Sequence, residues 1–256
     1  MIDPWPVTLF AGALGLIFGS FLNVCAWRWP RDESVVAPPS ACPECGEQIR
    51  WRDNVPVLGW ILLRGRCRDC QARISIQYPL VELTVGLVWA GLAYRYGPTV
   101  ETLRGAVFLT ILLGIALSDA RFYIIPDQFS VGGAVLGLAF APFAMGLTFT
   151  QSIYGAAVGF GVLWLVAMAG KVAFKKDAMG GGDLKMMAMV GAYVGVLGVL
   201  LTIFLGALLG AVIFGPISLK TQKLVPFGIF LAVGAAVTYG WGELIIGWYV
   251  GTVLGM

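Results

Sequence analysis

Long apolar stretches constrain this chain more than any other feature, because they alternate with polar segments along its whole length. They cover residues 7–26, 79–96, 103–118, 128–147, 151–172, 184–198, 199–219 and 224–240. About 20 apolar residues in a helix span the hydrocarbon core of a bilayer, so these eight stretches predict transmembrane helices. The chain is 12% charged, whereas soluble domains are roughly 25% charged. We therefore expect an all-α polytopic membrane protein of about eight transmembrane helices.

The sixth and seventh stretches run together through Gly195 and Gly198. One broken helix followed by a span is therefore an alternative, which changes the helix count by one. Residues 241–256 are compatible with an interfacial segment.

Positive charge predicts the orientation in the membrane. With the N-terminus outside, fifteen of the seventeen Lys and Arg residues fall on one side, and only Arg95 and Arg104 on the other. Cytoplasmic loops are enriched in basic residues, so the richer side is predicted to be cytoplasmic. The first stretch lacks the basic start and the cleavage site of a signal peptide, so we expect a retained helix. The net charge of +3 is too small to indicate nucleic acid binding.

Three regions follow from this pattern. Residues 1–26 are the first transmembrane helix, residues 27–78 are a polar cytoplasmic insert, and residues 79–256 are the main transmembrane domain. The insert carries two CxxC pairs separated by twenty-one residues. Their cysteines are Cys42, Cys45, Cys67 and Cys70.

Two CxxC pairs at this spacing are typical of a zinc ribbon, since each pair turns both sulfurs toward one tetrahedral ion. Four thiolates leave no open position on the metal, so the predicted zinc is structural. Two disulfides or four free thiols are the alternatives, but disulfides are rare in the cytoplasm. Cys25, at the end of the first apolar stretch, is expected to be a packing residue.

Two aspartates occupy matching depths in this topology. Asp119 is predicted at the cytoplasmic end of the third span, and Asp183 at the cytoplasmic start of the sixth. Two such carboxylates can perform aspartic proteolysis, in which one takes a proton from water and the other donates to the substrate carbonyl. A substrate strand can approach the backbone of the preceding glycines closely. We assign Gly180, Gly181, Gly182 and Lys185 to this active-site loop.

Structural alternatives exist for each acidic residue. Asp183 is equally interpretable as a helix N-cap, and its place at a helix start also favours the ionised form expected of a base. Asp127, after Pro126, is more simply an N-cap. Glu82 is a third acid on the same face, where it would pair with an arginine of the insert or line a substrate groove. Lys185 has the alternative role of a positive-inside anchor.

Residue types and motifs that the sequence lacks exclude several catalytic mechanisms. The chain contains no histidine, which excludes a Ser-His dyad and an HExxH metalloprotease. It also lacks a P-loop and the Rossmann fingerprint after a strand. Glycine-rich segments such as residues 157–161 and 206–210 are predicted to be packing seams between membrane helices.

The chain resembles the bacterial prepilin peptidases, or type IV leader peptidases, which are membrane aspartic proteases with a GxGD motif. The motifs that carry the resemblance occur in order along nearly the whole chain. They are GSFLNV at 19–24, the two CxxC pairs, YPLVE at 78–82, the Asp119 segment ending in IPDQ, GGGDLK with GAYVG, and VPFG at 225–228.

The resemblance implies that Asp119 and Asp183 are the catalytic pair and that Gly180 and Gly182 are the glycines of GxGD. It implies prepilin or pseudopilin substrates, cut at the cytoplasmic face of the bacterial inner membrane. Relatives with the four-cysteine insert also N-methylate the product with S-adenosylmethionine, so a second activity is implied. Many relatives have a second aspartate two residues after the first, where this chain has Arg121. This difference leaves Asp119 as the candidate in that segment.

Two other function classes fit parts of the pattern. An ion-coupled transporter would use the acids as a proton relay, but it predicts acids near the bilayer centre and repeated halves. A zinc-stabilised assembly scaffold without catalysis would tolerate replacement of both Asp119 and Asp183. The expected partners of the enzyme are its prepilin substrates and membrane lipid.

Overall fold

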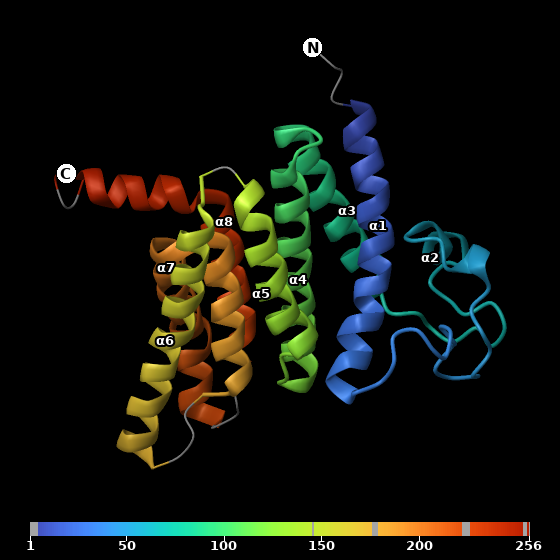
Figure 1. Ribbon diagram of the computed structural model, residues 1–256. Coiled ribbons are helices and arrows are strands. Elements are labelled where there is room, and N and C mark those ends of the chain that lie inside the picture. The colour runs from blue at the N-terminus through green and yellow to red at the C-terminus, as the bar shows by residue number, and fades with distance from the viewer. Residues whose placement is uncertain (1–4, 145, 176–178, 222–225, 253–254, 256) are drawn as a thin grey trace. The chain divides into compact units, whose positions relative to one another are not determined.

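The computed structural model describes residues 5–144, 146–175, 179–221, 226–252 and 255, with backbone only for 174 and 214–221. Helices are the main regular structure of the described residues, whose only β-type contacts are two isolated bridges within the otherwise irregular insert. Figure 1 shows the elements. The α-helices are α1 (Trp5–Arg28), α2 (Leu58–Leu62), α3 (Gln77–Tyr96), α4 (Val100–Phe122), α5 (Asp127–Phe140), α6 (Phe149–Phe174), α7 (Gly181–Thr221) and α8 (Phe227–Thr252). The all-α fold class is confirmed.

Five of these helices, namely α1, α4, α6, α7 and α8, are long and apolar enough to cross a membrane, within the part of the chain that the structure describes. Helix α3 carries Glu82 and Arg95, which lower its hydropathy. The expected 128–147 span is shorter than predicted, because α5 ends at Phe140 and a 3-10 turn containing Pro142 follows. Proline has no N–H to continue an α-helix.

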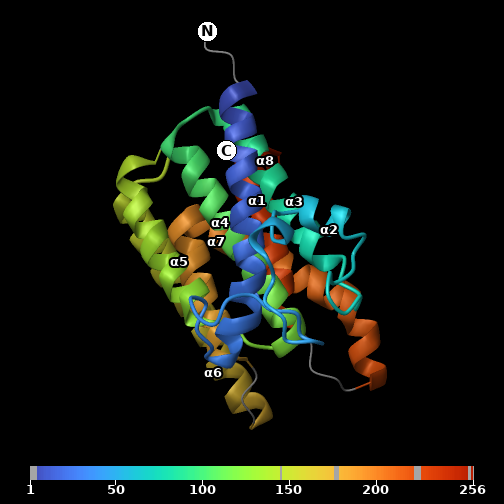
Figure 2. The ribbon, with the colours of Figure 1, turned by 90° about the vertical axis from the view of Figure 1, so that its right-hand side faces the viewer.

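The chain divides into two compact units, residues 1–110 and 111–256. In the first unit α1 packs along α3 through small residues, since a Cβ on Gly19 would lie 2.7 Å from the Cα of Glu82. Gly15 faces Gly86 at a similar separation. Figure 2 shows the insert with α2 beside these two helices. The Asn23 side chain donates to the Tyr78 carbonyl at 3.3 Å, which ties α1 to the start of α3.

In the second unit, α7 is two antiparallel segments joined at Gly195, whose φ of 71° and ψ of −173° are non-helical. The first segment follows α5, because Gly133 faces Met189 and Gly137 faces Tyr193. The second segment runs back along α8. Gly198 faces Thr238 near one end of this contact, and Gly210 faces Phe227 near the other.

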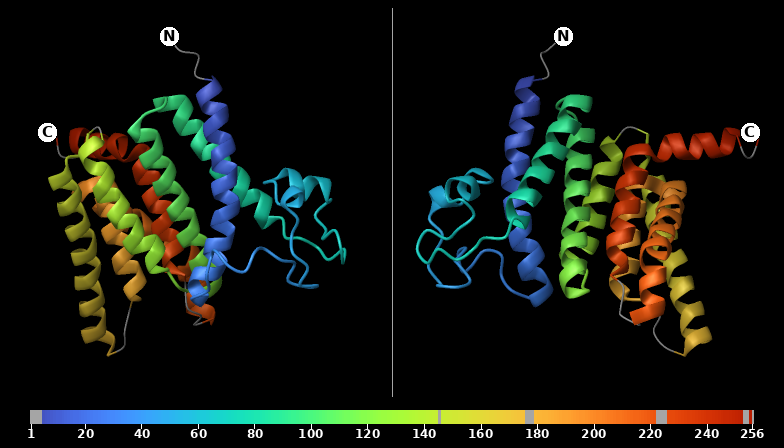
Figure 3. Two further views of the ribbon diagram at one scale, coloured as in Figure 1. Left: turned by 45° about the vertical axis from the view of Figure 1, so that its right-hand side comes forward. Right: turned by 180° about the vertical axis from the view of Figure 1, so that it is seen from behind.

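This reversal bears directly on the predicted helix count. The predicted stretches 184–198 and 199–219 correspond to the two segments of α7, which the structure describes as one helix broken at Gly195. The starts of α7 and α8 therefore lie at the same end of the second unit. In Figure 3 the last part of α8 turns aside and runs across the other end. Its exposed Trp241 and Trp248 are in the segment expected to be interfacial, which stays a prediction.

Candidate active site and metal centre

Asp119 lies in the last turn of α4 and is 6% exposed. Its Oδ2 accepts a hydrogen bond of 3.2 Å from the backbone N–H of Ile229, in the first turn of α8. The N–H of Gly228 also faces this carboxylate. Helix α4 ends three residues after Asp119, at Phe122, and Tyr123 follows with a φ of 56°. The carboxylate is therefore held between the end of one helix and the start of another.

Asp183 lies in the first turn of α7, which begins at Gly181, so it is not the N-cap residue. Its side chain is half-buried. The position of a Cβ on Gly182 would be 3.0 Å from the Cβ of Ile125, so the glycine loop packs closely on the segment that follows Asp119. The two carboxylates are near enough to interact electrostatically. The structure thus brings together the two aspartates that the sequence singles out.

Each of the two aspartates lies close to the start of a different helix. Asp183 belongs to the first turn of α7, and Asp119 accepts from the first turn of α8. A helix N-terminus favours negative charge, but here it favours both carboxylates. The helix dipole therefore does not distinguish which of the two aspartates is the base.

Asp127 is the first residue of α5, and Pro126 occupies the N-cap position without a side-chain cap. The N-cap interpretation of Asp127 is therefore wrong. Both of its carboxylate oxygens accept hydrogen bonds of 2.8 Å from Lys185 Nζ. This exposed ion pair joins the starts of α5 and α7, so Lys185 has an acidic partner in the structure.

Glu82 is 7% exposed in α3. Its Oε2 accepts a 2.7 Å hydrogen bond from the backbone N–H of Val57, the N-cap residue of α2. Val57 has a φ of 61°, which is unfavourable for a β-branched residue. This hydrogen bond of Glu82 is with the backbone of the insert, whereas the sequence predicted an arginine partner or a place in a substrate groove.

The four insert cysteines form one cluster, since their sulfurs all lie within 4.8 Å of one another. The Sγ atoms of Cys42 and Cys70 are 3.8 Å apart, close to the roughly 3.8 Å between two thiolates on a zinc ion with Zn–S of about 2.3 Å. All are free cysteines, so the disulfide alternative is not realised. Backbone N–H groups of Cys45 and Glu44 lower the pKa of Cys42 to about 7. This donor set fits a tetrahedral zinc ion.

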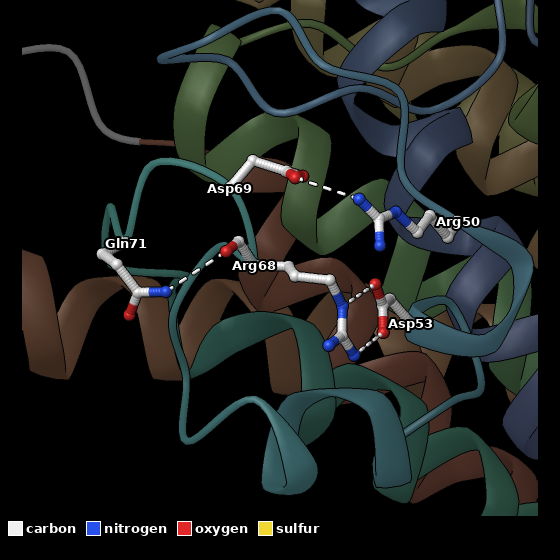
Figure 4. Close-up of polar contacts among 5 residues, drawn as sticks. All are labelled: Arg50, Asp53, Arg68, Asp69 and Gln71. Carbon is white, nitrogen blue, oxygen red and sulfur yellow. Dashed lines mark hydrogen bonds and ion pairs between the residues drawn. The ribbon is translucent and has the colours of Figure 1, made fainter.

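Two ion pairs fasten the second cysteine pair to the segment 50–53, as Figure 4 shows. The Arg68 guanidinium donates to both oxygens of Asp53, and Arg50 pairs with Asp69 at 3.2 Å. The hydrogen bond from Arg68 holds the pKa of Asp53 below its usual value. These ion pairs could not be predicted from the sequence, because nothing in the spacing indicates which charged residues pair.

A helical membrane bundle with two apposed aspartates, in a chain without histidine, defines a candidate membrane aspartic peptidase. The family models extend this class. The bacterial peptidase A24 N-terminal domain matches residues 13–96, and the type IV leader peptidase family matches residues 106–215. No solved structure matches the chain.

Similar proteins named prepilin leader peptidase/N-methyltransferase include one from Stutzerimonas stutzeri, 35% identical over 97% of this chain and 95% of the relative. Another, from Pseudomonas putida, is 34% identical over 95% of this chain and 94% of the relative. A third, from Myxococcus xanthus, is 41% identical over 75% of this chain but 58% of the relative. The chain belongs to the type IV leader peptidase family.

Proposed function

We propose that this chain is a prepilin leader peptidase whose catalytic pair is Asp119 and Asp183. The observation that carries the proposal is that the two carboxylates interact electrostatically at one end of the second unit, although they are 64 positions apart in the sequence (183 − 119). Family membership supports peptidase activity. The transporter alternative receives no support from the relatives.

The proposed chemistry needs one water and both carboxylates. One aspartate removes a proton from the water as the water oxygen attacks the scissile carbonyl carbon. The other donates a proton to the carbonyl oxygen, and collapse of the tetrahedral intermediate then releases the leader after proton transfer to the amine. Gly180 and Gly181 are exposed and have no close neighbour around their Cβ positions apart from Asp183, so a substrate strand has access beside it.

The substrates proposed are prepilins or pseudopilins, as the names of the relatives indicate. The location proposed is the bacterial inner membrane, with several spans and with the aspartates at the cytoplasmic face. Most of the positive charge lies on the side that carries Asp119 and Asp183, which supports this orientation. Lipid is then the partner of the exposed apolar side chains along the helices.

The insert is proposed to hold a structural zinc ion through its four cysteines, because their spacing and thiol chemistry fit that metal. N-methylation of the new N-terminus with S-adenosylmethionine is proposed from the names of the relatives alone. Within the described residues we assign no methyl-donor site.

The test is leader removal from a purified prepilin in detergent, comparing the wild type with Asp119→Asn and Asp183→Asn. Glu243→Gln is a matched control, because it neutralises an exposed acid elsewhere in the second unit. We expect cleavage by the wild type and the control and none by either aspartate variant, while all four proteins retain zinc. Undiminished cleavage by the two aspartate variants would refute the assignment and direct attention to Asp127 and Glu82.

A further inference from the structure

We propose that Gly228, at the start of α8, is a positioning residue that sets the place of the Asp119 carboxylate. The proposal rests on the proposed function, because it concerns one of the two aspartates assigned there. Gly228 belongs to VPFG, a motif for which the sequence provides no role. It is buried, and the N–H of the next residue donates to Asp119 Oδ2.

The space around Gly228 is filled by the aspartate itself. A Cβ at this position would lie 2.9 Å from Asp119 Oδ2 and 3.1 Å from its Cγ. It would also lie 2.9 Å from the Cδ1 of Ile125. The two separations of 2.9 Å are shorter than real Cβ atoms show, so an added methyl group must displace a neighbour. The neighbours are side-chain atoms, which move more easily than backbone, so the carboxylate is expected to move while α8 keeps its place.

The hydrogen bond at the same place gives the carboxylate a fixed direction. The first N–H groups of a helix have no partner within the helix, and that of Ile229 is used by a side chain 110 residues away. Hydrogen bonds to an ionised oxygen are among the stronger ones in proteins. Displacement of Asp119 by a methyl group at Gly228 would lengthen this bond and rotate the carboxylate away from it.

Ile125 connects this anchor to the second aspartate. The Ile125 side chain is 9% exposed. It lies against the positions that a Cβ would occupy on both Gly228 and Gly182. The starts of α7 and α8 therefore pack on one residue. A shift of Asp119 relative to α8 is thus also a shift relative to the loop that carries Asp183.

The kinetic test compares Gly228→Ala with Gly240→Ala, which makes the same change in the same helix where nothing lies within 4 Å of the new Cβ. A misplacement of about 1 Å in a catalytic group can cost about 100-fold in rate. We expect Gly228→Ala to lower the kcat of leader cleavage by about 10- to 100-fold, with little change in KM. Gly240→Ala is expected to match the wild type. Equal kcat values for the two variants, or a rise in KM alone, would overturn the proposal.

A second readout does not depend on catalysis. Gly228→Ala is introduced both into the wild type and into Asp119→Ala. We expect it to lower the thermal midpoint more in the wild type, because the shortened side chain of residue 119 in the variant leaves room for the new methyl group. Equal decreases in the two backgrounds would overturn the positioning role whether or not the aspartates are catalytic. If Gly228→Ala alone does not fold, folding of the double variant supports the proposal. Failure of both to fold contradicts it, since packing other than on Asp119 would then require the glycine.

Discussion

The cysteine cluster of the insert and the aspartate pair of the second unit are built in different ways. The four cysteines lie within 29 residues of sequence (70 − 42 + 1), and short backbone turns orient each pair. The residues proposed for the aspartate site, Asp119, Asp183 and Gly228, come from three helices. A local site can be recognised by spacing alone. For a dispersed site, the sequence indicates candidate residues but not the contacts that hold them.

The largest expected effect concerns the cysteine cluster, and it tests whether zinc binding depends only on the four clustered cysteines. Cys67→Ser removes one of four thiolates, so we expect bound zinc to fall from about one ion per chain to near zero. Cys25→Ala is the matched control, because Cys25 is also buried but lies outside the cluster. Metal analysis of the purified proteins checks this. Zinc retained by Cys67→Ser, or lost from Cys25→Ala, would contradict the assignment.

A smaller effect tests how the insert is attached to the helices. Glu82→Leu leaves the N–H of Val57 without its acceptor, which costs about 1–3 kcal/mol. This corresponds to hydrogen exchange in α2 that is roughly 5- to 150-fold faster. Glu82→Gln keeps an acceptor oxygen and is expected to change exchange less. Mass spectrometry of peptides covering residues 55–63 measures it, and unchanged exchange in Glu82→Leu would show that the bond does not hold the insert.

A pH series probes the ion pair beside the second cysteine pair. The hydrogen bond from Arg68 keeps the pKa of Asp53 below its usual value, so the ionised pair stabilises the folded insert at every pH above the unfolded pKa of about 3.9. That contribution disappears as the pH falls through the lower, folded pKa. We therefore expect the wild type to have a higher urea midpoint than Asp53→Asn. The difference between the two midpoints should be the same at pH 7 and at pH 5.

Proteolysis within the insert during urea titration gives these midpoints. The difference between the two proteins should decrease only below about pH 4. A difference that already declines between pH 7 and pH 5 would mean that Arg68 does not hold Asp53 ionised.

The smallest expected effect is that of the Lys185–Asp127 ion pair, near the aspartate pair, on thermal stability. The Lys185–Asp127 pair is 44% and 60% exposed at its two side chains, and such pairs contribute about 0–1 kcal/mol. Lys185→Met, Asp127→Asn and the double variant should therefore each lower the thermal midpoint by less than about 4 °C. The decreases should shrink in high salt because screening weakens exposed pairs. A larger decrease, unaffected by salt, would assign a buried structural role to the pair.

Much of the fold follows from the sequence because it depends on local composition. Hydropathy alone locates both segments of α7, although the reversal at Gly195 becomes visible only in the structure. Charge along the chain places Asp119 and Asp183 on one face before any contact is known. Cys25 is buried, as expected of a packing residue.

The supporting contacts could not be predicted, because each joins residues far apart in the sequence. Glu82 accepts a hydrogen bond from the backbone of Val57, whereas the sequence predicted an arginine partner or a place in a substrate groove. Asp127 resembles an N-cap, yet the approach of α7 gives it Lys185 as a partner. The anchoring of Asp119 by α8 requires the antiparallel return of α7, which carries the chain back to the end where α8 starts.

The most direct test of the central claim is a comparison of leader-cleavage rates for Asp119→Asn, Asp183→Asn and the double variant. Residues that act as one catalytic unit have strongly non-additive effects. We predict that each single variant loses at least about 1,000-fold in kcat/KM and that the double variant loses no more than either single one. Losses that multiply in the double variant, or substantial activity in either single variant, would contradict a shared two-aspartate site.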